Sequence, residues 1–237
     1  CFLCQPEAGI PWLDGLVGSE IGIETAPASV TANGTSSATI TVQTLDALGN
    51  PLSSGGATII LSTTGGASLS SVTDIGDGSY TATITNTAAE NVTITGTLGG
   101  NPLSQSALVT FTPGTGSTTT STITTSANSV AADGTSSATL TVTLRDAQGN
   151  ELTSGGQTVV LSSTGSGIVS VVTDNNNGTY TATITNTIAE SATISGTLNA
   201  VALTDTATIT FTSGTISTDT TLISASPSST DANGVSS

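Results

Sequence analysis

The chain of 237 residues carries sixteen acidic residues against one basic residue, Arg145, and it contains no lysine and no histidine, which gives a net charge of −15. This charge argues against binding to nucleic acid or to an anionic membrane surface, because both need lysine or arginine beside phosphate groups. The absence of histidine and lysine also removes the commonest general bases, so we predict that the chain is no enzyme and holds no cofactor.

The N-terminal segment, residues 1–24, matches nothing else in the chain. Its two cysteines, Cys1 and Cys4, form a lone Cys-x-x-Cys pair, whereas a zinc site needs a second pair or histidines. Three interpretations stay open: a local or intersubunit disulfide, a lipidated Cys1 exposed by signal cleavage, or the edge of a fragment. Because the sequence contains no methionine, we expect its N-terminus to result from processing or from the choice of fragment.

The apolar part of this segment has two interpretations. In the first, the segment is structural: the end of a preceding domain, or a strand packing on the first domain. In the second, it is an assembly element that docks in a neighbouring subunit as an added strand. The assembly hypothesis assigns the contact to Trp12, Leu13, Leu16 and Val17. Under that hypothesis the partners are copies of the same chain, joined into a homopolymer.

Two long passages of the sequence recur 100 residues further on. TANGTSSATITVQTLDALGN (31–50) returns as AADGTSSATLTVTLRDAQGN (131–150), and SYTATITNTAAE (79–90) returns as TYTATITNTIAE (179–190). A third copy opens at DANGVSS (231–237), so we expect the natural polypeptide to continue. Solenoid and propeller repeats run to about 20–50 residues, and a longer repeat is therefore a whole domain.

Each copy predicts a series of short strands separated by turns. In the first copy, apolar residues alternate with threonine over 38–45, which is the pattern of a half-buried strand. Further strands are predicted at 58–61, 69–72, 80–85, 92–97 and 103–112. Turn residues every ~8–12 positions are typical of a β-sandwich. The predicted fold class is all-β, with tandem immunoglobulin-like β-sandwiches of about seven strands each arranged end to end.

The repeats set the domain boundaries. The predicted organisation is a non-repeat segment (1–24), a first domain (25–113), a linker (114–122), a second domain (123–213), a second linker (214–222) and the start of a truncated third repeat (223–237). Both linkers are short and rich in threonine, which favours extended backbone. We therefore expect a semi-extended rod with limited hinging.

One tyrosine in each copy occupies a position that immunoglobulin-type domains use structurally. Such domains place a tyrosine two residues before a core cysteine, with its hydroxyl bonded to nearby backbone. Here Tyr80 and Tyr180 precede Ala82 and Ala182, which hold the position of that cysteine. We predict a structural tyrosine corner in both domains.

The acidic turns and the glycosylation sequons have simple structural interpretations. Asp74, Asp77 and Asp174 lie in oxygen-rich turns that resemble calcium loops, but the EF-hand spacing and its glutamate are missing. We therefore predict no metal site and assign these carboxylates to local backbone hydrogen bonds, with calcium binding as the alternative. Asn33, Asn91 and Asn177 begin Asn-x-Thr sequons, which are open to glycosylation in a compatible host.

The order of sequence segments within each copy resembles that of one known family. The segments 31–42, 46–55, 60–66 and 72–85 follow one another as in the bacterial Ig-like repeats of invasin- and intimin-type adhesins. The resemblance covers both full copies and the opening of the third. It implies extracellular sandwiches stacked end to end as a stalk, with any receptor-binding tip in a separate domain.

These observations predict a non-catalytic extracellular protein: a stalk or fibre segment that projects from a cell surface or forms a surface filament. Its partners would be copies of itself, or a host-surface or glycan ligand bound by regions outside this sequence. The alternative is a carbohydrate-binding or accessory Ig-like module of a secreted enzyme or of a phage virion protein. That alternative needs a platform of exposed aromatic side chains, and the sequence holds only one Trp, two Tyr and three Phe.

Overall fold

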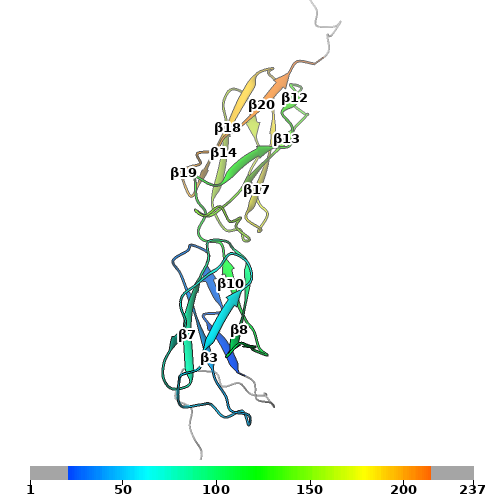
Figure 1. Cartoon of the computed structure of the whole chain (residues 1–237). Coiled ribbons are helices and arrows are strands. Elements are labelled where there is room, and N and C mark those ends of the chain that lie inside the picture. The colour runs from blue at the N-terminus through cyan, green and yellow to red at the C-terminus, as the bar shows by residue number, and fades with distance from the viewer. Residues whose placement is uncertain (1–20, 215–237) are drawn as a thin grey trace, which may run out of the picture.

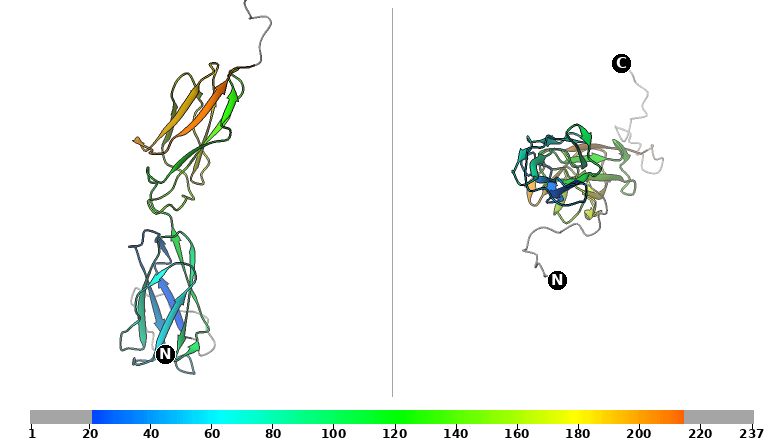
Figure 2. Two further views of the ribbon diagram at one scale, coloured as in Figure 1. Left: turned by 45° about the horizontal axis from the view of Figure 1, so that its top comes forward. Right: turned by 60° about the horizontal axis from the view of Figure 1, so that its bottom comes forward.

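The computed structural model describes residues 21–214, which form two β-sandwiches joined end to end (Figures 1 and 2). The element order within this range contains strands and no helix, with β1–β10 in the first domain and β11–β20 in the second. The predicted all-β class and the tandem immunoglobulin-like arrangement are confirmed.

The first domain consists of two sheets packed face to face. One sheet has the order β1–β3–β7–β5 with β6 on β7, and the other has the order β2–β10–β8–β4 with β9 on β8. All pairs are antiparallel except β2 with β10. The strand bounds are β1 Gly22–Ala26, β2 Ser29–Thr31, β3 Ala38–Gln43, β4 Ile59–Thr63, β5 Ser68–Leu69, β6 Thr73–Asp74, β7 Ser79–Thr85, β8 Asn91–Leu98, β9 Asn101–Pro102 and β10 Ala107–Thr112.

The second domain repeats this topology strand for strand. Its sheets have the orders β11–β13–β17–β15 with β16 on β17, and β12–β20–β18–β14 with β19 on β18. The strand bounds are β11 Thr122–Thr125, β12 Ser129–Ala131, β13 Ala138–Thr143, β14 Val159–Ser163, β15 Ile168–Val169, β16 Thr173–Asp174, β17 Thr179–Thr185, β18 Ser191–Leu198, β19 Val201–Ala202 and β20 Ala207–Thr212.

Each domain has ten strands where the sequence predicts about seven, and the additional strands are short. β1 and β2 precede the first predicted strand and were not predicted, and the chain passes from one sheet to the other between them. The predicted strand 69–72 is interrupted at Ser70, whose hydroxyl accepts the Thr83 N–H at 2.9 Å in place of a backbone carbonyl. β1 begins at Gly22, so three residues of the segment assigned to 1–24 pair in the first sheet.

The two cores are built by strict alternation along the strands. In β7 the side chains of Tyr80, Ala82 and Ile84 are buried, and the intervening threonines face outward. β17 repeats the pattern. Each domain has its own hydrophobic cluster, and both cysteines of the chain precede residue 21. The described domains are therefore held together by strand pairing and apolar burial, without a disulfide in either core.

Candidate functional site

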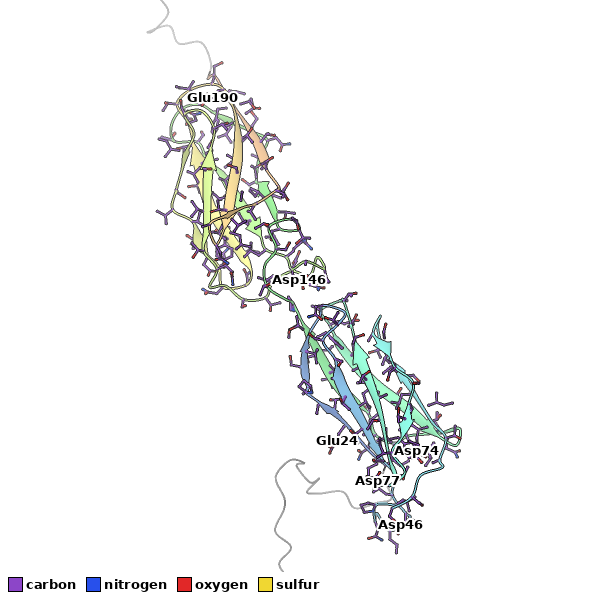
Figure 3. All side chains as sticks on the ribbon, turned by 90° about the vertical axis from the view of Figure 1, so that its left-hand side faces the viewer. Glu24, Asp46, Asp74, Asp77, Asp146 and Glu190 are labelled. Carbon is purple, nitrogen blue, oxygen red and sulfur yellow. The ribbon has the colours of Figure 1, made fainter. Side chains whose placement is uncertain are left out.

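At the joint between the two domains, residues of one domain form hydrogen bonds with residues of the other. The joint is made by a turn of the second domain, residues 146–150, and a loop of the first, residues 86–90. We call these the docking turn and the receiving loop. Figure 3 shows Asp146 of the docking turn at the boundary between the two sandwiches.

The docking turn is fixed by the Asp146 side chain. Its carboxylate accepts the main-chain N–H groups of Gln148 at 3.0 Å and of Asn150 at 2.9 Å, while Gly149 takes up a φ of +88°. At its base, Arg145 donates to the Gly149 carbonyl and forms an ion pair with Glu151. These bonds hold the docking turn in one defined conformation.

The receiving loop is fixed by Asn86, which is buried. The Asn86 side chain accepts the Ala88 N–H at 3.0 Å and donates to Glu90 Oε1 at 2.8 Å. This bracing leaves the main-chain carbonyl of Thr87 and the N–H of Ala89 available to a partner.

Asn150 joins the two elements. Its Nδ2 donates to the Thr87 carbonyl at 2.9 Å, and its Oδ1 accepts the Ala89 N–H at 2.9 Å. The same Nδ2 also donates to Asp146 Oδ2 at 2.9 Å, which holds the amide in this orientation. One side-chain amide thus pairs with the backbone of the other domain as a neighbouring strand would.

The linker between the domains is attached to the second domain through most of its length. Gly114 N–H donates to Asp146 Oδ2 at 2.9 Å, Ser117 N–H to the Arg145 carbonyl at 2.7 Å, and Thr120 Oγ1 to the Asp146 carbonyl at 2.6 Å. The linker is therefore a bonded part of the second domain.

The linker also closes the base of the second core. A methyl group at Gly116 would lie 3.1 Å from Leu198 Cδ2 and 3.6 Å from Leu152 Cδ2, so the backbone there packs directly on these leucines. Leu152 is 9% exposed, whereas its counterpart Leu52 in the first domain is 42% exposed. Two surface grooves flank the joint, with Pro113 and Thr153 lining both.

The charge of Asp146 is stabilised at the joint. The residue is 1% exposed, and this burial would raise the pKa of its carboxyl. The hydrogen bonds from Asn150, Gly114 and Gln148 outweigh the burial and keep that pKa below its ordinary value. Four donors around one carboxylate make Asp146 the centre of the docking turn, the linker and the Asn150 contact.

Of the three aspartates considered for calcium, Asp77 lies in a turn, whereas Asp74 and Asp174 end the short strands β6 and β16 and also accept an N–H group from a distant loop. Asp74 accepts the N–H groups of Gly56 and Gly76, at 2.6 and 2.9 Å. Asp77 accepts from the hydroxyl and N–H of Ser79, which lowers the pKa of Asp77. Asp174 accepts from Gly156 and Asn176, as its counterpart does in the first domain. Within residues 21–214, no group of three or more Asp, Glu, Cys or His side chains could hold a metal ion.

Tyr80 and Tyr180 are buried, and each binds a backbone amide across its own domain. The Tyr80 hydroxyl accepts the Ala57 N–H at 2.7 Å, and the Tyr180 hydroxyl accepts the Gln157 N–H at 2.9 Å. Burial raises the pKa of Tyr180. Their assignment as a structural tyrosine corner stays a prediction.

The sequon asparagines lie at separate places in the two domains. Asn33 and Asn177 accept backbone N–H groups within their turns, and Asn91 Oδ1 accepts the Thr110 hydroxyl at 2.8 Å. Their glycosylation stays a prediction. Cys1, Cys4, Trp12, Leu13, Leu16 and Val17 lie outside the described residues, and the assembly hypothesis attached to them stays a prediction as well. In the part of the chain that the structure describes, no helix has the length and apolar character to span a membrane.

The sequence alone did not single out Asn150, Thr87 or Ala89. The available signal was the repeated motif Asp-Ala-x-Gly-Asn at 46–50 and 146–150, which we interpreted only as a turn. Its second function depends on the neighbouring domain.

Paired five-strand sheets, duplicated end to end with a bonded linker, define a tandem array of immunoglobulin-like β-sandwiches. The sequence profile of the family described as Invasin, domain 3, matches residues 18–114 and again residues 117–214. The chain belongs to this family, once for each domain, and the predicted resemblance is confirmed.

Solved structures of bacterial adhesins are similar to the chain. Invasin, a bacterial integrin-binding protein, is 27% identical with a TM-score of 0.60, and the match covers 83% of this chain and 42% of the invasin chain. InvD of Yersinia pseudotuberculosis is 26% identical with a TM-score of 0.60, covering 88% and 62%. The Escherichia coli adhesin FdeC is 29% identical with a TM-score of 0.50, covering 85% and 66%. The chain thus spans less than two thirds of each of these structures. A sequence comparison with curated proteins gave no match.

Proposed function

We propose that the two domains form a non-catalytic segment of an extracellular stalk or surface filament, which holds an adhesive element away from a bacterial surface. The observation that carries the proposal is the joint: a linker bonded to the second domain and a docking turn bonded to the first. A flexible tether would leave these backbone groups to water. The joint instead limits bending, which is the property that a projecting stalk needs.

The family supports an adhesin as the parent protein. Invasin is a bacterial integrin-binding protein, and FdeC is an Escherichia coli adhesin. We infer that the present chain contributes length and stiffness, and that any host-surface receptor or glycan is bound by regions outside the two domains. Self-association through the N-terminal segment remains part of the proposal as a second kind of partner.

The burial of the aromatic residues argues against the alternative of a carbohydrate-binding module. Sugar platforms need exposed aromatic rings. The four aromatic side chains among the described residues, Tyr80, Phe111, Tyr180 and Phe211, are each at most 2% exposed.

Residual dipolar couplings test the stalk proposal directly. In a weakly aligned sample, a stiff joint gives both domains one common alignment tensor. A flexible joint gives two tensors of different magnitude, and that result would refute the stalk function. A glycan array with the same protein separates the alternative: binding to a defined sugar would favour the accessory module.

A further inference from the structure

Each domain carries both halves of the joint, one at either end. The docking turn of the first domain, residues 46–50, lies at the end away from the joint, as Asp46 in Figure 3 shows. The receiving loop of the second domain, residues 186–190, lies at the opposite end of the molecule, where Figure 3 places Glu190. The chain therefore has one docked pair at its centre and one half of a pair at each extremity.

The outer receiving loop is already in the conformation that the inner one has when docked. Asn186 Oδ1 accepts the Ile188 N–H at 3.0 Å, and Asn186 Nδ2 donates to Glu190 Oε1 at 2.8 Å. These two distances equal those at Asn86 in the inner loop. Ile188 replaces Ala88, but both side chains are exposed and the backbone groups keep their positions.

The two loops differ in their exposure to solvent. Ala89, whose N–H binds Asn150, is half-buried, whereas Ala189 is exposed. Among the described residues, neither the Ala189 N–H nor the Thr187 carbonyl has a hydrogen-bond partner. The outer docking turn shows the same contrast, since Asp46 is half-buried and Asp146 is 1% exposed.

We propose that the loop 186–190 is a docking site for a further Ig-like repeat of the same polypeptide, bound through the asparagine of its Asp-x-x-Gly-Asn turn. The occupied inner loop shows the geometry of such a contact. The sequence after the second domain continues in the same order, with a threonine-rich segment at 214–222 and the opening of a third copy at 231–237.

The size of the contact favours a tethered partner over a separate chain. Stable interfaces between separate proteins bury at least ~1,000 Å². Two hydrogen bonds from one side chain fall far short of that. A short linker supplies an effective concentration in the millimolar range, so the same contact closes readily within one chain. This inference does not depend on the stalk function, because tandem domains of any function would dock in this way.

The test extends the chain after Ser237 with a copy of residues 138–214, which continues the third repeat in register. Amide hydrogen exchange followed by NMR then reports on single N–H groups. We expect exchange of the Ala189 N–H to slow by about tenfold in the extended chain relative to the 237-residue chain. In an extension whose counterpart of Asn150 is alanine, the protection is lost while the added domain stays folded by its own amide pattern.

Two substitutions in the original chain calibrate the measurement. Asn150→Ala should release the Ala89 N–H by a similar factor, and Asn50→Ala, the same change in an equivalent turn, should leave it unchanged. Unaltered Ala189 exchange beside a folded third domain would overturn the proposal. Protection of Ala189 that grows with the concentration of the unextended chain would also overturn it, because a second copy would then be the occupant.

Discussion

We predict that the packing of the linker on Leu152 stabilises the second domain, and that Leu152→Ala removes this contribution. Leu152 is 9% exposed beneath the linker backbone at Gly116. Replacing it removes three carbon atoms, worth about 2 kcal/mol at ~0.8 kcal/mol for each buried CH₂ group. The cavity left under a bonded linker raises the expected loss to about 3 kcal/mol, within the usual range for buried leucines.

Leu52→Ala is the matched control at the same place in the first domain. Leu52 is 42% exposed, so little more than half of the side chain leaves water on folding and no closed cavity forms. The expected loss is about 1 kcal/mol. Urea titrations followed by NMR resolve the two domains, because each contributes its own amide signals. Equal losses in the two variants would refute the conclusion that the linker closes the second core.

Three further predictions concern single residues. Tyr180→Phe should cost the second domain about 1 kcal/mol in urea unfolding, because the Gln157 N–H loses its acceptor. Gly178→Ala should prevent stable folding of that domain, because the added methyl group would lie 1.9 Å from the Leu152 carbonyl oxygen. Gly149→Ala meets no atom within 4 Å and should cost only about 1–2 kcal/mol, because of its φ of +88°. Above the ordinary aspartate pKa of ~3.9, the wild-type chain should be more stable than the Asp146→Asn variant by a constant amount. This difference should disappear as the pH falls through the lowered pKa of Asp146, which calorimetry at several pH values measures.

Each of these has a clear contrary result. If the Tyr180→Phe domain is as stable as the wild type, the hydrogen bond from the Gln157 N–H to the Tyr180 hydroxyl does not stabilise the domain. Equal effects at Gly178 and Gly149 would mean that backbone conformation alone, and not the close approach, requires glycine there. For Asp146 the sign is fixed by its lowered pKa: a stability difference that grows on acidification would contradict a carboxylate stabilised in its charged form.

Much of each domain could be predicted from the sequence because it follows from local patterns. Period-2 alternation places Tyr80, Ala82 and Ile84 in the core, and the carboxylate of Asp77 accepts the Ser79 N–H within its turn. The strand count was less accurate. A hydroxyl such as that of Ser70 can replace one carbonyl in a ladder, and nothing in the alternation of neighbouring residues announces that substitution.

The joint could not be predicted in this way. Asn50 and Asn150 occupy the same motif and make the same bonds to their own aspartates. What separates them is a neighbouring domain that only Asn150 contacts among the described residues. The same holds for Leu52 and Leu152, which differ in exposure because of a linker packed on one of them. Such differences arise from the placement of whole domains, and the local sequence of the repeated motif does not encode them.

The attachment of the linker to the second domain also has a consequence for a chain that folds from its N-terminus. Gly114 and Ser117 find their acceptors at Asp146 and Arg145, and these positions do not exist until the strands on either side have paired. A chain that folds domain by domain from its N-terminus therefore completes the first sandwich without this linker. The joint forms only when the second sandwich has folded. Each joint in such an array therefore forms after the domain on its C-terminal side is complete.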